Sequence, residues 1–294
     1  MRSLESVSAQ SFQPSRVLIA THARFQADVL RICRDFPGFE LLVDEQSHLG
    51  GHLRDVATRS SVSEAVAYLD DDDYWLPGKL EEQRSALAED VWMVSCQSGD
   101  FMEGAFPSGA YPERTYDGAE DLSEWLFWRR PLSKGRNTLP TSTLLVRTEI
   151  AKTVGWRRDL RRHQDWDFLL RSAGIFGRKG IRQLNSVLVA RQTGGADSVS
   201  AGTDFAESVR WLDSVREEFT PRAAADFLVG QPARYAVTAY DFCSAATIVR
   251  RAFREDRPSW RSFALCGSGL LPRRRFERTL ARQSSAAKDG GSVV

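Results

Sequence analysis

The sequence predicts an α/β protein with a doubly wound, mainly parallel sheet and a C-terminal helical appendage. Over the first hundred residues, short apolar runs typical of strands alternate with segments whose apolar side chains recur at helical spacing. Beyond residue 200 the chain contains only helix-forming segments. Because strands that alternate with helices pair mainly in parallel, we expect a wound sheet followed by a separate helical part.

The elements of the sheet are expected in a regular order. Strands are predicted at 17–20, 39–43, 65–69 and 91–94, with helices at 25–36, at 53–59 and after Pro77. Polar clusters follow the first three strands at 21–24, 44–47 and 70–73. Because ligands bind beyond the carboxyl ends of such strands, these clusters are expected to meet in one crevice.

The second half of the chain has fewer regular elements. Residues 97–140 are irregular apart from an amphipathic helix near 122–128, a buried strand is expected at 141–146, and a helix opens within 161–171. Further helices are predicted at 205–219, 222–228, 234–253 and 259–265. Residues 1–15 and 284–294 are predicted to be disordered. A wound-sheet domain at 16–200 and a helical appendage at 201–283 are therefore expected.

The composition excludes several classes of protein. A formal net charge of +1 with 27% charged residues argues against a dedicated nucleic-acid-binding protein. The four cysteines are widely spaced, so neither a zinc site nor a disulfide framework is indicated. The N-terminus lacks the apolar run of a signal peptide, and no segment is long enough to span a bilayer. A cytoplasmic protein is expected, with peripheral contact at the inner face of the membrane as an extension of that location.

Four consecutive carboxylates, those of Asp70, Asp71, Asp72 and Asp73, directly follow the third strand. Like charges at a strand end repel one another unless a cation or hydrogen-bond donors intervene. Mg²⁺ or Mn²⁺ is the natural partner, because these ions take oxygen ligands and share them with water and substrate phosphates. The alternative is a solvated acidic turn. The apolar residues 74–76 that follow, with Pro77 opening a helix, favour the metal site.

Asp165 lies at the entry to the helix predicted within 161–171. One interpretation is an N-terminal cap, which an aspartate favours because of its side-chain oxygen and the helix dipole. The other is a general base, which requires a carboxylate held apart from the metal-bound ones so that it stays free to accept a proton.

Taken together, these segments resemble the inverting family 2 glycosyltransferases with the GT-A fold, over about residues 16 to 192. That family has a strand into Pro-Thr-Tyr-Asn-Arg, a strand into Asp-Asp-Gly-Ser, an Arg-Asn pair, and a strand into an Asp-rich motif often followed by Trp-Leu-Pro-Gly-Lys-Leu. A Thr-Ser-Thr strand and a Glu-Asp or Gln-Asp pair follow. The matching residues here, in the same order, are Thr21 and Arg24; Asp44, Glu45 and Ser47; Arg54 with Asp55; Asp70 to Asp73; Thr141 to Thr143; and Gln164 with Asp165.

The resemblance implies a GT-A-type fold whose Rossmann-like half binds a nucleotide, and it implies roles for the matching residues. The residues implied in nucleotide binding are Thr21, Arg24, Glu45, Arg54, Asp70 and Asp71. The residues implied at the metal are Asp72, Asp70 and Asp73, with Asp72 as the direct ligand and Asp70 nearer the ribose. Asp165 matches the family's catalytic base, which deprotonates the acceptor hydroxyl.

The function implied is Mn²⁺- or Mg²⁺-dependent, inverting hexosyl transfer from a nucleoside-diphosphate sugar, of UDP or dTDP type, to a glycan, lipid-linked or small-molecule acceptor. Such an enzyme would serve bacterial polysaccharide, glycolipid or glycosylated natural-product biosynthesis. Glu45, Gln46 and Asp55 depart from the family pattern and leave donor choice open. Two alternatives also stay open, a metal-dependent nucleotidyltransferase and a nucleotide-sugar-binding protein without turnover. The first half has no glycine-rich phosphate loop of the kind a nucleotidyltransferase ordinarily uses.

Arginine dominates the C-terminal region. Between Arg250 and Arg282 there are ten arginines and three acidic residues, interspersed with large apolar side chains. Such a region suits the surface of an anionic membrane, where lipid-linked acceptors reside. The alternative is a solvated helix face packed on the catalytic domain.

Overall fold

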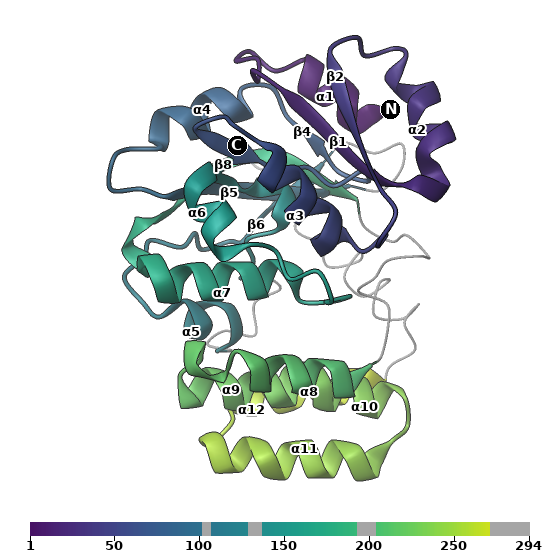
Figure 1. The fold of residues 1–294 in the computed structure, drawn as a ribbon. Coiled ribbons are helices and arrows are strands. Elements are labelled where there is room, and N and C mark those ends of the chain that lie inside the picture. Colours follow the sequence, from purple (N-terminus) through teal and green to yellow (C-terminus); the bar gives the residue numbers. More distant parts are fainter. Residues whose placement is uncertain (102–106, 129–136, 193–203, 271–294) are drawn as a thin grey trace, which may run out of the picture. The chain divides into compact units, whose positions relative to one another are not determined.

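A computed structural model of the chain describes residues 1–101, 107–128, 137–192 and 204–270 (Figure 1). The chain divides into two compact units. The larger unit consists of Met1–Phe127, Ser133–Gly202 and Val215–Thr220, and the smaller of Trp128–Leu132, Thr203–Ser214 and Pro221–Val294. The tail predicted to be disordered at 284–294 lies outside the described residues.

Two parallel strands begin the wound part of the larger unit. Strand β1 (Val17–His22) pairs with β2 (Phe39–Asp44), in a register that sets His22 opposite Asp44. A 3₁₀ turn and helix α2 (Gln26–Cys33) connect the two strands, and α3 (Gly50–Ser60) packs against both. The polar carboxyl ends of the two strands therefore lie side by side, as the sequence predicts.

A six-stranded sheet forms the rest of the larger unit. Its order is β3-β7-β5-β8-β4, with β6 paired to β5. The bounds are β3 (Ala65–Ala67), β4 (Tyr74–Trp75), β5 (Met93–Phe101), β6 (Ser108–Tyr111), β7 (Leu145–Arg147) and β8 (Ile181–Gln192). β5 and β8 are parallel, whereas the other four pairings in this sheet are antiparallel. The parallel direction expected from the alternating pattern is found for β1–β2 and β5–β8. It does not hold for the other four pairings, because hydrophobic period gives the order of elements and not their direction.

Helices of the larger unit cover the sheet. The helices are α1 (Arg2–Ser8), α4 (Lys79–Ala86), α5 (Leu122–Phe127), α6 (Thr148–Val154) and α7 (Gln164–Phe176), in addition to α2 and α3. The strand predicted at 141–146 is shorter, because Thr141–Thr143 form a 3₁₀ turn before β7. The Thr143 hydroxyl closes this turn by donating to the Pro140 carbonyl at 2.6 Å.

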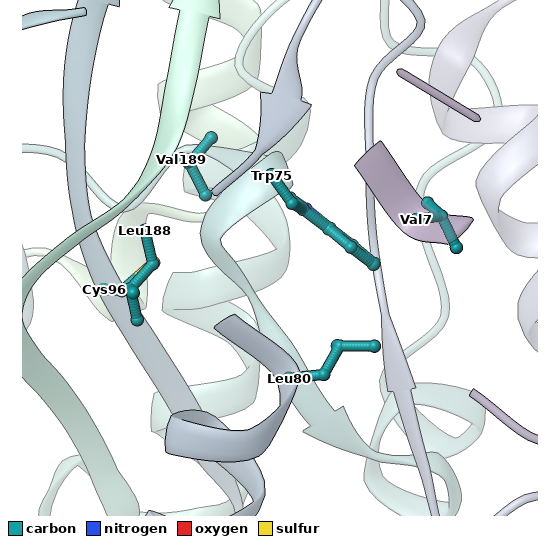
Figure 2. Packing of buried hydrophobic residues seen from close by; sticks show 6 residues of the cluster. All are labelled: Val7, Trp75, Leu80, Cys96, Leu188 and Val189. Atoms are coloured by element: carbon teal, nitrogen blue, oxygen red, sulfur yellow. The ribbon is translucent and has the colours of Figure 1, made fainter. Parts of the chain in front are cut away.

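Trp75 brings the Asp run against the hydrophobic core. It is buried with Leu80, Cys96, Leu188, Val189 and Val7, as Figure 2 shows. Strand β4, which carries Trp75, directly follows the four aspartates. The acidic run is thereby attached to the core within two residues.

The prediction of a disordered N-terminus is wrong for residues 1–15. Helix α1 contributes Val7 to the core, and the Ser6 hydroxyl accepts a hydrogen bond from the Trp75 backbone N–H at 3.0 Å. The buried Gln10 amide donates to the Leu76 carbonyl at 3.0 Å and accepts from the Leu80 N–H at 3.2 Å. These long-range contacts have no local sequence signal, because the polar composition of the segment resembles that of a solvated tail.

The smaller unit is helical. Its described helices are α8 (Phe205–Ser214), α9 (Pro221–Leu228), a π-helical turn (Val229–Ala233), α10 (Arg234–Thr238), α11 (Phe242–Glu255) and α12 (Trp260–Gly267). The helix predicted at 205–219 ends at Ser214, and the one at 234–253 breaks near Tyr240, whose φ is 60°. Asp241 and Ser259 cap α11 and α12 by accepting the backbone N–H of Ser244 and Ser262. Within the described segments, no helix has the length and apolar character needed to cross a bilayer.

We expect Gln10→Ala to lower the free energy of unfolding by about 1–3 kcal/mol, because it leaves buried backbone groups beside the core without partners. Urea denaturation followed by circular dichroism measures the change. The control is Gln13→Ala, at an exposed glutamine that bonds only within its own segment, and it should shift the value by less than about 0.5 kcal/mol. Equal stability of both variants would show that the N-terminal segment does not anchor the Asp run.

Candidate functional site

The Asp run forms a turn fixed by Ser142. The Asp73 N–H donates to the Asp70 carbonyl at 3.2 Å and closes the turn. The Ser142 hydroxyl accepts from the Asp70 N–H at 3.1 Å and donates to the Asp73 carboxylate at 2.6 Å. Ser142 stands in the Thr-Ser-Thr segment, to which the sequence analysis assigned no role. Its position in that segment was the feature of the sequence that could have pointed to this role.

Asp73 is engaged inside the protein. Its side chain is buried, and its second oxygen accepts the Gln192 N–H at the end of β8 at 3.0 Å. Burial raises the pKa of Asp73 to about 7, against the opposing effect of the Ser142 hydrogen bond. Both of its oxygens therefore connect the turn to neighbouring segments.

Arg54 of α3 joins the Asp run to the start of α7. Its guanidinium donates to an Asp70 oxygen through one nitrogen and to the Gln164 side-chain carbonyl through another. The guanidinium carbon also lies 5.3 Å from the centre of the Trp156 ring. Residues separated by more than ninety positions in the sequence are thus held by one cation.

Asp165 lies in the first turn of α7, close enough to Arg54 and Asp70 for both charges to act on it. The interpretation of Asp165 as the N-terminal cap is wrong, because the cap position of α7 is His163. Burial raises the pKa of the Asp165 carboxyl, while the positive charge of Arg54 opposes that shift. Among the hydrogen bonds of the described chain, the Asp165 carboxylate accepts a single short-range one, from the N–H of the adjacent Trp166 at 3.2 Å.

The residues predicted to hold the nucleotide lie at the ends of β1 and β2. Thr21 is buried, whereas Arg24 and Glu45 are exposed, and the Arg24 guanidinium carbon lies 4.4 Å from the centre of the Phe25 ring. Of the residues the structure describes, none of these three forms a hydrogen bond or ion pair with Asp70, Asp72 or Asp165. Among the described residues of α3, Arg54 is the one that forms a hydrogen bond with a carboxylate of the Asp run.

Asp44 has a partner that sequence reasoning missed. Its carboxylate accepts the Gln46 N–H at 2.8 Å and lies 2.8 Å from Nε2 of the buried His52. These bonds, the Gln46 N–H first, lower the pKa of Asp44. The only sequence signal was that His52 falls in the first turn of α3. Asp55, by contrast, is structural, because it pairs with Arg59 and Arg158 and accepts the Trp156 N–H.

A buried lysine contacts the tryptophan that follows the Asp turn. Lys79 is fully buried, donates to the Gln83 side-chain carbonyl, and lies 4.2 Å from the centre of the Trp75 ring. Trp75 in turn donates from its indole nitrogen to the Ser142 carbonyl at 3.0 Å. Burial lowers the pKa of Lys79 to about 8. Trp75 therefore contacts both an interior cation and Ser142, the residue that fixes the Asp turn.

The three-aspartate metal set predicted from the sequence is not assembled. No group of three or more His, Cys, Asp or Glu side chains within the described ranges could by itself hold a metal ion. Asp70 pairs with Arg54, Asp73 is bonded on both oxygens, and Asp71 and Asp72 are exposed. The arrangement still fits Mg²⁺ or Mn²⁺ chemistry, because such ions are commonly held by one or two carboxylates together with substrate phosphates. Asp72 offers such a carboxylate on the turn that Ser142 fixes by hydrogen bonds.

Comparison with known proteins finds distant glycosyltransferase relatives of this chain. No family model matches the chain. The uncharacterized glycosyltransferase YwdF of Bacillus subtilis is 20% identical over 220 residues, which cover 73% of this chain and 77% of YwdF. The amylovoran biosynthesis glycosyltransferase AmsB of Erwinia amylovora is 22% identical over 273 residues, 88% of each protein. The crystal structure of S. aureus TarS 1-349 shares the fold with a TM-score of 0.50 and 15% identity, over 87% of both chains.

These relatives support a family 2-like glycosyltransferase. The GT-A fold class expected from the sequence is confirmed by the structural neighbour. Within this glycosyltransferase, the residues that the structure brings together are Arg54, Asp70, Asp73, Ser142, Gln164 and Asp165.

The lowered pKa of Lys79 makes the free energy of unfolding of this glycosyltransferase depend on pH. The unfolded chain has the ordinary lysine pKa of 10.5 and the folded chain about 8, so between these pH values the unfolded state binds more protons and stability rises with pH. Relative to Lys79→Met, the wild type should therefore gain about 2–3 kcal/mol as pH rises through this window. Urea denaturation at several pH values measures the difference. Lys179→Met, at an exposed lysine, is the control and should show no such trend; a flat difference for Lys79→Met would contradict the assignment.

Proposed function

We propose that this glycosyltransferase moves a sugar from a nucleoside-diphosphate donor to an acceptor hydroxyl with inversion at the anomeric carbon, and that it requires Mn²⁺ or Mg²⁺. The observation that carries the proposal is the position of Arg54, which donates both to Asp70 and to Gln164, the residue before Asp165. One arginine thus links the Asp turn to the residue that precedes Asp165, a separate carboxylate suited to proton transfer.

Asp165 is the proposed base. It would take the proton of the acceptor hydroxyl, whose oxygen then bonds to the anomeric carbon while the bond from that carbon to the diphosphate oxygen breaks. The raised pKa of Asp165 suits this role, since a base is most effective when its pKa approaches the working pH. Attack from the face opposite the leaving diphosphate gives inversion. The positive charge of Arg54 limits the rise in the pKa of Asp165.

Asp72 is the proposed metal ligand, with Asp70 nearer the ribose and Asp73 fixing the turn. A divalent ion, when bound, neutralises the charge that develops on the leaving diphosphate. The hydrogen bonds of Ser142 to the Asp70 N–H and the Asp73 carboxylate set the direction of the turn. Asp72 is therefore presented outward without prior pairing to Arg54, which Asp70 occupies.

Thr21, Arg24, Glu45 and Asp71 are proposed to contact the nucleotide, for which UDP or dTDP is favoured. Support comes from their places at the ends of β1 and β2 and in the Asp turn. The acceptor is proposed to be a glycan, a lipid-linked sugar or a small molecule of bacterial polysaccharide, glycolipid or natural-product biosynthesis. The relative AmsB is named as an amylovoran biosynthesis glycosyltransferase, which supports a role in a biosynthetic pathway.

Purified protein incubated with a panel of nucleotide sugars and Mn²⁺ tests the reaction class. Release of free sugar and nucleoside diphosphate marks a glycosyltransferase that uses water as a slow acceptor. With pyrophosphate added, formation of a nucleoside triphosphate and a sugar 1-phosphate would mark a nucleotidyltransferase instead, and binding without any product would mark a binding protein. The anomer formed with a competent acceptor decides between inversion and retention.

Asp72→Ala is expected to abolish Mn²⁺-dependent donor binding, measured by titration calorimetry. The thermal midpoint of the variant should hold or rise, because removing one of four adjacent like charges relieves repulsion. The matched control is Asp35→Ala, at an exposed aspartate away from the turn, which should leave donor affinity unchanged. Unaltered Mn²⁺-dependent affinity in Asp72→Ala would show that the Asp run does not hold the metal.

Asp165→Asn is expected to lower turnover by about 10² to 10⁴, because an amide of the same shape cannot accept the proton. Donor affinity should stay within a factor of about two. Asp159→Asn, at an exposed aspartate paired with Arg157, is the control for the loss of one charge nearby. Near-normal turnover in Asp165→Asn would leave the base unassigned while leaving the Asp72 result untouched.

A further inference from the structure

Large apolar side chains of α11 and α12 are exposed in the smaller unit. The exposed fraction is 54% for Phe242, 55% for Phe253, 59% for Trp260 and 36% for Phe263. The Phe253 and Phe263 rings lie 6.0 Å apart, so the surfaces of the two helices join there. We call these four residues the aromatic patch; helices α11 and α12 are marked in Figure 1.

The patch is continuous along α11. Phe242, Ala246, Val249 and Phe253 recur at i, i+4, i+7 and i+11, which places them within roughly 60° of one another around the helix axis. The buried residues Ala245, Ile248 and Ala252 occupy a different stripe, which already faces the interior of the unit. The exposed stripe is therefore a second apolar face, additional to the one that packs.

Arginines border this second face. At about 100° per residue, Arg250 and Arg254 lie roughly 60–100° around α11 from Phe253, and Arg257 follows the helix end. The acidic residues of the region are neutralised by other arginines, because Arg251 lies against Asp213 and Glu255, and Arg222 against Asp256. The guanidiniums of Arg250, Arg254 and Arg257 form no ion pair with any described residue.

We propose that the aromatic patch docks on an anionic phospholipid bilayer. Phenylalanine and tryptophan at the headgroup level, with arginines on the flank, match the interface of a bilayer that carries negative charge. A second copy of the chain is a poorer fit, because a two-fold interface centred on α11 would bring the Arg250 and Arg254 side chains of both copies together. The charge around the patch thus selects a negative surface.

Co-sedimentation of the full chain with vesicles tests the proposal. Phosphatidylcholine vesicles are compared with an equal mixture of phosphatidylcholine and phosphatidylglycerol. We expect binding to the anionic vesicles that weakens with salt, and little binding to the neutral ones. Arg250→Gln with Arg254→Gln should weaken binding about 10- to 30-fold, and Phe242→Ala with Phe253→Ala about tenfold or more.

Control variants keep the test decisive. Ile175→Ala and Arg34→Gln change an exposed apolar and an exposed basic residue of the larger unit, and they should bind vesicles as the wild type does. Circular dichroism and donor hydrolysis should be unchanged in both double variants, since the patch lies outside the proposed catalytic residues. The proposal is overturned if the wild type does not sediment with anionic vesicles, or if either double variant binds them like the wild type. It is also overturned if sedimentation velocity shows a dimer that the Phe242/Phe253 variant abolishes.

Discussion

The geometry of the Asp run depends on the hydroxyl of Ser142. This one group accepts from the Asp70 backbone and donates to the Asp73 carboxylate, whose other oxygen accepts from the end of β8. Three segments from distant parts of the chain therefore share one small hydrogen-bonded cluster. Because Asp73 is buried, loss of any of these partners would leave a polar group without compensation, which restricts the turn to a narrow range of conformations.

The four identical side chains of the Asp run lie in different environments, which their neighbours determine. Asp70 is neutralised by Arg54, Asp73 is desolvated and bonded on both oxygens, and Asp71 and Asp72 face solvent. The repulsion within the run is thus relieved at two positions by the protein itself. Arg54 and the Ser142 hydroxyl bind two of the four carboxylates that the sequence analysis assigned to a cation. Fewer carboxylates are therefore left to hold a metal than the number of aspartates suggests.

Prediction from the sequence succeeded where a local pattern carried the information. Hydrophobic period located β1, β2, α3, α4 and the helices beyond residue 200, and the family motifs identified Arg54, Asp70 and Asp165, which the structure brings together. It did not reveal α1, because the contacts of Ser6 and Gln10 are made with residues more than sixty positions away. Strand direction and the 3₁₀ turn at Thr141–Thr143 were missed for a related reason, since both are decided by tertiary pairing. The His52 contact to Asp44 likewise depends on how α3 packs against β2.

The bond between Asp73 and Gln192 spans 119 positions of sequence, and this separation has a consequence for biosynthesis. A ribosome releases the chain from its N-terminus, so the acidic turn emerges long before the strand that completes it. Until β8 is available, the turn lacks its last donor, and Trp75 lacks the strand against which it pairs. The nascent protein therefore carries an unfinished, negatively charged loop through most of the synthesis of its larger unit, and the order of translation makes this site among the last parts of that unit to mature.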